Sequence, residues 1–571
     1  MLSRYFSINL ALFMFVVTVK ANDYLFVNGR SLYSIVLPPD ATETEKTAAS
    51  ELQAVIKRMS GADVPITTTP AGKNIFVGWS SRLGVAKPDA ADESYTYKTV
   101  DGNLYIYGGS QRGTMYGVYA FLEREMGVRW YTSSYTKIPS VSVFRLDSLN
   151  HTESPAFRQR LDFCYDALRH NEWVARNLLN SQDGIQKSNY GKMQAYWGTH
   201  SFRRLIPPSD YFHQHPEFFS QIKGRRVDNA QLCLSNEDMR RELVKNLKGV
   251  MTRMPDYWCY DVSQNDNMSP CECADCQRLV KKYGGQSGIM IWFVNQVARE
   301  IKRTFPDKYI GTFAYHYTRQ APKSNIKPDD NVVVRLCNIE CCMAHPLEQC
   351  KLNCSFLKDM DDWKKITQNI YVWDYTTGFH HYLLPFPNFE TMASNYRYFK
   401  RSNVMGVLEE GAYDAPWNEF SELKQWLIAK LLWNPDLNVD SLATVFINDY
   451  YGAAAPYVKQ YYDLCNAQIT NNTHFTIHVD GKSDLYSDRF VKEGMALMSK
   501  ALAVVDKDGE EYLRVRRIAA QVYYLKACRN KVKSLADDAC RQLTDIIAND
   551  PTIVAERGRK LEKMLKVLGY E

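Results

Sequence analysis

Hydrophobic positions follow three different patterns along the chain, and the first covers the N-terminal quarter. Residues 42–61 carry apolar side chains at helical spacing, with Thr42 or Thr44 as a cap and Gly61 after the last turn. Short apolar stretches lie on either side, and an Asp-Gly pair at 101–102 is typical of a hairpin turn. We therefore predict a small N-terminal α/β accessory domain over residues 23–150, in the order β-α-β-β-β-α.

From about residue 155 to 433 the pattern changes to a repeated strand, loop and helix. Eight short apolar segments are predicted as strands: 157–165, the second half of 175–181, 229–235, 257–265, 309–316, 331–338, 369–375 and 404–411. The clearest helical stretches between them are 237–254, 287–305, 355–366, 389–400 and 419–433. Eight strands, each followed by a helix over ~250 residues, is the count of a (β/α)8 TIM barrel.

The third pattern is a series of amphipathic helical stretches that fills the rest of the chain. The predicted fold class is therefore α/β: a (β/α)8 TIM barrel with an N-terminal α/β accessory domain and a C-terminal helical domain. We expect the catalytic barrel to cover residues 151–435 and the C-terminal helical domain to cover residues 436–571.

Composition and the first residues indicate a soluble protein that is exported. Hydrophobic residues make up 45% and charged residues 23%, which favours a soluble globular protein over a disordered or membrane-spanning chain. Residues 1–21 combine Arg4, an apolar run and a small-x-small end at Val19 and Ala21, so we predict a signal peptide. The protein is then exported to the periplasm, the cell surface or the medium, and no later stretch is apolar enough for a membrane span.

Charge excludes one class of partner. Without Arg4 and Lys20, the 70 basic residues become 68, against 64 acidic residues, and the net charge is +4. These charges are dispersed along the chain, so we expect no nucleic-acid partner.

Polar side chains gather where the predicted strands end. In TIM barrels the catalytic side chains project from the carboxyl ends of the strands. The residues found there are Trp197 and His200 after strand two, Asn265, Asp266 and Asn267 after strand four, Tyr315 and His316 after strand five, Glu340 after strand six, Trp373, Asp374 and Tyr375 at strand seven, and Glu409 and Glu410 at strand eight. Glycoside hydrolysis needs this mixture, because one carboxyl group protonates the leaving oxygen while a second group stabilises or attacks the sugar. Since strand residues alternate in direction, at most one of Glu409 and Glu410 should face the mouth.

Cysteines form a second chemical signal. Cys271, Cys273 and Cys276 are spaced C-x-C-x-x-C directly after the fourth predicted strand. They could bind zinc with a fourth ligand from the loop after strand six, or they could form disulfides or remain thiols. Because the usual second C-x-x-C is missing, we favour structural disulfides or thiols, and we expect no metal and no cofactor.

Several motifs resemble known glycosidases. The segments at 45–66 and 110–139 resemble the accessory domain that precedes the barrel in family 67 α-glucuronidases and family 20 hexosaminidases. The barrel motifs resemble glycoside hydrolase family 163: YFHQHPEFFSQIKGRR, QLCLSN, VSQNDNMSPCECADC, AYHYTRQAP, RLCNIECC, VWDYTTGF and GVLEEG. This resemblance implies an endo-β-N-acetylglucosaminidase that cuts the chitobiose core of complex N-glycans, with an N-glycan or glycoprotein as its partner. It also implies a retaining mechanism by substrate assistance, in which the 2-acetamido oxygen attacks C1.

Carried onto this chain, the resemblance gives Asp266 and Glu340 as the catalytic pair. Glu340 is expected to be the general acid and Asp266 to orient the acetamide, although the reverse assignment, or an acid at Glu409 or Glu410, stays open. The expected substrate-binding residues are Trp197, His200, Asn265, Asn267, Tyr315, His316, Trp373, Asp374, Tyr375, Glu409 and Glu410.

Two other functions stay open. One is an exo-acting α-glucuronidase or β-hexosaminidase; a glucuronidase would need a basic group for the uronate, and Arg335 lies two residues before the end of strand six. The other is a non-catalytic glycan-binding protein on a decayed barrel, against which the retained carboxylates argue.

Overall fold

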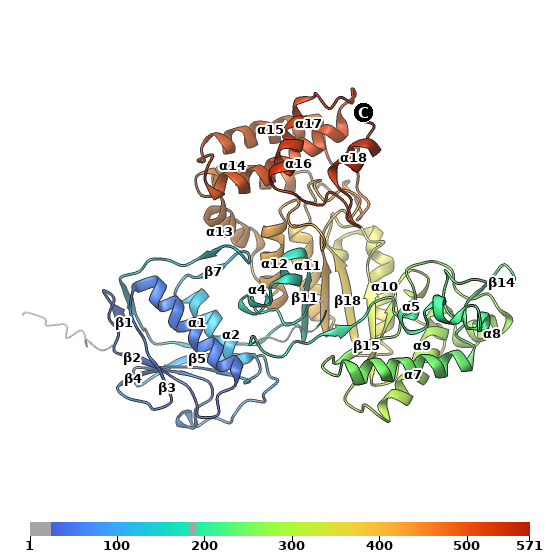
Figure 1. Ribbon diagram of the computed structural model, residues 1–571, viewed down its shortest axis with the longest axis horizontal. Coiled ribbons are helices and arrows are strands. Elements are labelled where there is room, and N and C mark those ends of the chain that lie inside the picture. The colour runs from blue at the N-terminus through green and yellow to red at the C-terminus, as the bar shows by residue number, and fades with distance from the viewer. Residues whose placement is uncertain (1–23, 183, 185–188, 571) are drawn as a thin grey trace, which may run out of the picture. The chain divides into compact units, whose positions relative to one another are not determined.

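The computed structural model describes residues 24–182, 184 and 189–570 (Figure 1). The predicted signal peptide, residues 1–21, lies outside the described residues. The chain forms two compact units, of which one runs to Phe121 and includes Ile138–Thr152, and the other comprises Leu122–Lys137 and all residues from Glu153 onward. The domain boundaries proposed from the sequence stay predictions.

The first unit is built on a six-stranded sheet. Its strands, in spatial order, are β10 (Asn150–Glu153), β5 (Tyr95–Val100), β6 (Asn103–Gly108), β4 (Lys73–Val77), β2 (Tyr33–Val36) and β3 (Ile66–Thr67). A separate ribbon pairs β1 (Tyr24–Val27) with β9 (Val143–Arg145). The predicted hairpin is confirmed, since β5 and β6 are antiparallel and are joined by Asp101 and Gly102, both with positive φ.

Helix α1 (Glu43–Ser60) begins and ends with the signals that predicted it from the sequence. Thr42 caps it reciprocally: the Glu45 amide donates to Thr42 Oγ1 at 3.2 Å, and the Thr42 amide donates to Glu45 Oε2 at 2.9 Å. The helix ends at Gly61, whose φ of +78° is the left-handed conformation that glycine adopts freely. Of the two caps considered from the sequence, Thr42 is therefore the one used.

The second unit contains a seven-stranded sheet in which every pair is parallel. In spatial order the strands are β11 (Gln159–Phe163), β19 (Gly406–Glu410), β18 (Ile370–Tyr375), β17 (Val332–Cys337), β16 (Tyr309–Ala314), β15 (Cys259–Asp261) and β12 (Tyr196–Trp197). All except β12 fall within predicted strands. Every residue of β17 is buried, as expected for a parallel strand covered on both faces.

Two predicted strands are wrong, and this leaves the sheet open. Residues 229–235 form no strand, since only an isolated bridge joins Leu232 to Phe219. Residues 175–181 form none either, because Leu178 has a φ of +60°, which breaks the extended backbone. The structure is thus a mixed α/β protein with a parallel half-barrel sheet, and the paired strands of the described residues do not close an eight-stranded barrel.

Asn180 takes the place of the missing strand. Its side-chain Oδ1 accepts from the Arg160 amide at 2.9 Å and its Nδ2 donates to the Arg158 carbonyl at 2.8 Å. Its own carbonyl accepts from the Gln194 amide at 2.8 Å. The Asn180 side chain therefore makes the two hydrogen bonds at the edge of β11 that the backbone of a neighbouring strand would otherwise make.

Helices follow the strands largely as predicted. They are α7 (Glu237–Arg253), α8 (Ala274–Tyr283), α9 (Gln286–Lys302), α10 (Cys354–Lys364), α11 (Phe389–Arg401) and α12 (Ser421–Trp433). All residues of α12 are buried, because it packs against β11, α11 and α13. Short helices and ribbons fill the long connection between β11 and α7: α3 (Tyr165–Arg169), α4 (Asn171–Arg176), α5 (Phe202–Leu205), α6 (Pro208–Tyr211), β13 (Gln221–Ile222) and β14 (Arg225–Arg226).

The last part of the second unit is helical, as predicted, and its later helices are drawn in red in Figure 1. They are α13 (Val439–Tyr451), α14 (Ala455–Asn466), α15 (Asp488–Ala503), α16 (Glu510–Arg529), α17 (Asp538–Asn549) and α18 (Leu561–Val567). Their buried side chains, such as Leu525, belong to the same hydrophobic core as Phe313 of the sheet. Among the described residues, no helix is long and apolar enough to cross a membrane.

Candidate active site

A cavity of about 720 Å³ opens at the carboxyl ends of the parallel strands. The last residues of four strands line it: Phe163 of β11, Cys337 of β17, Tyr375 of β18 and Glu410 of β19. A pocket of this size accommodates several sugar-sized groups and lies where catalytic side chains gather in folds with parallel strands.

The cavity brings together eight of the residues proposed from the sequence. They are His200, Asp266, Tyr315, His316, Glu340, Trp373, Tyr375 and Glu410. Three carboxyl groups, two imidazoles and three aromatic rings therefore share one space, as the strand-end argument required.

The other five proposed residues lie away from the cavity. Asp374 and Glu409 point to the opposite face of their strands, where Asp374 accepts from Asn338 at 2.6 Å and Glu409 accepts from the Tyr396 hydroxyl at 2.7 Å. Both lie next to cavity residues in the sequence, so the alternation of side chains along a strand explains the difference. Trp197 is turned outward in the same way and packs against Tyr260.

Asn265 and Asn267 serve the loop rather than the cavity. The Asn265 amide donates to Gln231 Oε1 at 2.8 Å, and Gln231 Nε2 donates back to the Asn265 carbonyl at 2.8 Å and to Asn267 Oδ1 at 3.0 Å. These bonds fix the loop on both sides of Asp266, which is the member of the triplet that reaches the cavity.

Glu410 has an environment that suits an acid. Its Oε2 accepts a hydrogen bond from Trp373 Nε1 at 2.8 Å. Burial raises the pKa of the Glu410 carboxyl group to about 8, and the negative charges of Glu556 and Asp266 act in the same direction while the Trp373 bond opposes them. At neutral pH this carboxyl group therefore holds its proton for most of the time.

Asp266 stands in a more open environment. Its side chain is 51% exposed, Tyr315 donates a hydrogen bond to Oδ1 at 3.1 Å, and Arg557 Nη2 lies 3.9 Å from Oδ2. Burial, together with the charge of Asp266, raises the pKa of Tyr315, which therefore keeps its proton and remains a donor. The cavity thus contains two carboxyl groups in contrasting surroundings, the arrangement that separates acid from base roles in many hydrolases.

Glu340 belongs to an ion-pair network at the cavity wall. Arg319 Nη1 lies 3.0 Å from Glu340 Oε2, and the same guanidinium donates through Nε to Asp359 at 2.8 Å. His316 Nδ1 lies 2.9 Å from Glu340 Oε1. A guanidinium is the natural partner of a carboxylate, and here Arg319 and His316 hold the two oxygens of Glu340 in place.

Two cavity histidines have strained backbones. His200 and His316 have φ values of +52° and +51°, a conformation that costs a non-glycine residue about 1–3 kcal/mol. The His200 ring lies 4.9 Å from that of Phe313, and its Nδ1 lies 2.7 Å from the Gln264 carbonyl oxygen. Strain of this kind is retained where the surroundings fix a side chain for binding or catalysis.

Sequence reasoning missed the C-terminal part of the cavity wall. A turn at 553–559, closed by a bridge between Ala555 and Arg559, contributes Glu556, Arg557 and Arg559. It is held in place because the Glu556 amide donates to the Phe379 carbonyl at 2.9 Å and Tyr413 donates to Glu556 Oε1 at 3.1 Å. The Arg557-Gly558 pair could have predicted a turn, but no pattern connects it to the strands of the sheet, which end with Glu410.

Arg335 also lines the cavity, and its guanidinium is surrounded by aromatic rings. Its guanidinium lies 3.6 Å from the ring centre of Tyr196, 4.9 Å from Tyr371 and 5.1 Å from Trp373. With only 1% of the residue exposed, it acts as a buried cation among aromatic faces. Arg204, Arg557 and Arg559 also line the cavity.

The fold and the cavity define a class: a mixed α/β protein with a parallel half-barrel sheet, consistent with a glycoside-hydrolase-like fold. The profile of the family described as "Domain of unknown function (DUF4838)" matches residues 130–463, more than half of the chain. The protein therefore belongs to this family. A search of curated proteins found no match.

Solved structures of glycoside hydrolases match the chain at low sequence identity. The family GH115 4-O-methyl-α-glucuronidase BtGH115A, described as having specificity for decorated arabinogalactans, is 12% identical with a TM-score of 0.58; the match covers 92% of this chain and 76% of that one. The chitobiase FjGH20 of Flavobacterium johnsoniae is 12% identical with a TM-score of 0.47, covering 95% and 97%. CpGH84D is 8% identical with a TM-score of 0.49, covering 95% and 96%.

Proposed function

We propose that the protein is a glycoside hydrolase and that Glu410 is its general acid. The proposal rests on the partly buried carboxyl group of Glu410 at the cavity, whose pKa is raised to about 8, beside the more exposed carboxyl group of Asp266. A general acid must hold a proton at the working pH and reach the glycosidic oxygen. Glu410 meets the first condition through burial, and its position at a strand end supports the second.

The finer proposal is an endo-β-N-acetylglucosaminidase acting on the chitobiose core of N-glycans. In this scheme the 2-acetamido oxygen of the substrate attacks C1, while Asp266, with its Tyr315 hydrogen bond, orients the acetamide N–H. Trp373, Tyr375 and Phe313 supply aromatic faces for sugar rings. The sequence resemblance to family 163 supports this substrate class. The catalytic pair expected from the sequence, Asp266 and Glu340, is the alternative assignment.

Analysis of the soluble products tests this function. The full chain is incubated with a glycoprotein that carries complex-type N-glycans, and released material is analysed by mass spectrometry. Endo action gives an intact oligosaccharide ending in one GlcNAc and leaves the other GlcNAc on asparagine. Release of monosaccharides alone would contradict the endo proposal, and glycan binding without hydrolysis at any pH would favour a non-catalytic protein.

A second candidate is an exo-acting α-glucuronidase. Four arginines line the cavity, Arg204, Arg335, Arg557 and Arg559, and cationic groups of this kind can hold a uronate carboxylate. The GH115 α-glucuronidase has a similar fold at low sequence identity. Release of a single uronic acid from a glucuronidated oligosaccharide, but not from a neutral one, would establish this candidate. A β-hexosaminidase would instead release single GlcNAc residues.

The predicted signal peptide gives the proposal a location. An exported enzyme meets glycoproteins of its surroundings rather than those of its own cytoplasm, which agrees with the proposed substrate. Detection of the mature chain beginning near Asn22 in an exported fraction would support this part.

A further inference from the structure

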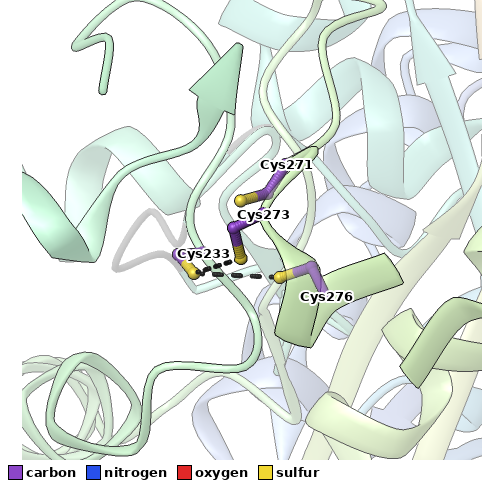
Figure 2. Close-up of side chains that lie close together, drawn as sticks. All are labelled: Cys233, Cys271, Cys273 and Cys276. Carbon is purple, nitrogen blue, oxygen red and sulfur yellow. Dashed lines mark hydrogen bonds between the residues drawn. The ribbon is translucent and has the colours of Figure 1, made fainter. Parts of the chain in front are cut away.

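Four cysteine thiols converge beside the loop that carries Asp266. Cys271 and Cys273 precede helix α8, Cys276 lies in its first turn, and Cys233 follows the β13–β14 ribbon (Figure 2). All four are buried, and their sulfur atoms lie within 4.8 Å of one another. The fourth member therefore comes from residues 229–235, and not from the loop after strand six that the sequence suggested.

The sulfur spacing matches a tetrahedral metal site. Cys233 Sγ lies 3.6 Å from Cys273 Sγ and 3.7 Å from Cys276 Sγ. A tetrahedron with zinc–sulfur bonds of about 2.3 Å has edges of about 3.8 Å. None of the fourteen cysteines is paired in a disulfide, and one thiol equidistant from two others is an arrangement for a shared ion rather than for one disulfide.

The surroundings supply donors for thiolates. The Gln221 amide donates to Cys271 Sγ at 3.3 Å, and Arg226 Nη1 lies 3.8 Å from the same sulfur. Ser235 Oγ lies 3.2 Å from Cys276 Sγ. Four thiolates around a dication leave a net charge of about −2, which N–H donors, a guanidinium and the N-terminus of α8 would offset.

We propose that Cys233, Cys271, Cys273 and Cys276 bind one Zn²⁺ as a closed structural site. The ion would join residues 229–235 to the loop between β15 and α8, two segments already bonded through Gln231 and Asn265. Asp266 lies five residues before Cys271, so the metal would fix the backbone from which Asp266 enters the cavity. This site is independent of which reaction the cavity catalyses.

Metal analysis of the full chain tests the site. Wild-type protein, purified without chelator, is analysed by inductively coupled plasma mass spectrometry and compared with Cys233→Ser. The variant should lose one zinc equivalent per chain, whereas Cys354→Ser, which changes the exposed cysteine outside the cluster, should lose none. Cobalt(II) exchanged into the wild type should give the visible absorption of a tetrahedral thiolate site.

The wild-type measurement keeps the proposal falsifiable even if Cys233→Ser does not fold. Two disulfides among the four cysteines in peptide mapping, or four thiols that alkylate freely without zinc release, would overturn it. Iron in place of zinc, with visible absorption in the protein as purified, would overturn the choice of metal.

A second cluster is supported by an independent observation. Cys342, His345, Cys350 and His474 place their ligand atoms within 4.8 Å of one another. His474 Nδ1 lies 3.3 Å from Cys342 Sγ and 3.8 Å from Cys350 Sγ, close to the edge of about 3.6 Å for mixed sulfur and nitrogen ligands on zinc. His345 Nε2 lies 2.9 Å from the Thr470 carbonyl oxygen, which fixes the tautomer that leaves Nδ1 free to bind a metal.

The geometry points to a second zinc ion at this cluster. It would join the loop after β17, which bears Glu340, to the segment bearing Thr476 and His478 of the cavity wall. His345→Ala should lose one zinc equivalent and keep the four-cysteine site, so that the cobalt form loses only part of its absorption. Wild-type protein with a single zinc that disappears in Cys233→Ser but not in His345→Ala would overturn this second site.

Discussion

Glu409 and Glu410 are neighbours in the chain with opposite environments. Glu410 faces the cavity and receives the Trp373 hydrogen bond, whereas Glu409 faces the helices and receives that of Tyr396. The alternation of a strand was enough to predict that only one of them would reach the mouth. It could not say which one, because that depends on the register of β19 against β18 and β11.

The pH dependence of activity follows from the state of Glu410. In the proposed mechanism its protonated form is the active one, so kcat/KM should fall as pH rises through about 8. In Trp373→Phe the hydrogen bond that lowers this pKa is lost, and the fall should move to higher pH. A pH profile of kcat/KM for the wild type and the variant measures the shift.

Trp79→Phe is the matched control for this shift. Trp79 also donates through Nε1, to the Val85 carbonyl, but it belongs to the first unit. Its profile should coincide with that of the wild type. An alkaline limb that stays in place in Trp373→Phe, or moves to lower pH, would argue against Glu410 as the acid.

Glu556 is a cavity residue that could not be predicted from the sequence. Strand-end reasoning found Asp266, Tyr315 and Glu410 because the carboxyl ends of parallel strands meet at one edge. Glu556 lies in a turn near the C-terminus, and its position depends on tertiary contacts with Phe379 and Tyr413. No local pattern encodes such contacts.

Among the elements, the missing strand at 175–181 is the clearest departure from expectation. The apolar residues Leu178 and Leu179 suggested a strand, but Leu178 is left-handed and Asn180 bonds to β11 through its side chain. A side-chain amide that replaces a peptide group has no periodicity, so hydrophobic patterning could not reveal it. Strands with long apolar runs, such as β17 and β18, were predicted correctly. A parallel strand that is buried on both faces carries apolar side chains at nearly every position, and such a run is visible in the sequence.

Asn180→Ala tests this replacement. The Arg160 amide and the Arg158 carbonyl would lose their partners, which should lower the free energy of unfolding by about 2–4 kcal/mol. Hydrogen–deuterium exchange should become faster in peptides that contain β11, and urea denaturation should give the loss of stability. Asn472→Ala, at an exposed position, should change neither. Equal protection of β11 in both variants would show that Asn180 carries no such role.

At the scale of the whole molecule, three carboxyl groups with raised pKa values make stability depend on pH. Burial raises the pKa of Asp162 and Glu410 to about 8 and that of Glu419 to about 7. Each folded-state value lies above the unfolded value near 4, so the folded state binds these protons more tightly. The free energy of unfolding should therefore fall as pH rises toward 8.

The fall in stability is best measured between about pH 6.5 and 8. The pKa of His381 is lowered in the folded state, so this histidine makes stability rise with pH, mainly below about pH 6.5. Thermal unfolding midpoints of the wild type should fall across the interval. Asp162→Asn should flatten the fall, and Asp484→Asn, at an exposed site, should leave it unchanged. A wild-type midpoint that rises with pH here would contradict the protonated state of the buried acids.

The cavity itself is a property of the whole second unit. Strands spread from Gln159 to Glu410 provide its floor, and residues between Thr476 and Arg559 complete its wall. The sequence predicted the helical character of the last part but not its contribution to the site, because helix patterns show which face is buried and not what it is buried against.

Hydrolysis by three forms of the protein is the most direct test of the central claim. Initial rates of glycan release from a complex-type N-glycoprotein are measured by mass spectrometry for the wild type, Glu410→Gln and Glu409→Gln. Glu410→Gln should be slower by a factor on the order of 10²–10⁴, because it removes the proton donor, whereas Glu409→Gln should keep most of the rate. Near-wild-type release by Glu410→Gln would contradict the assignment of Glu410 as the general acid.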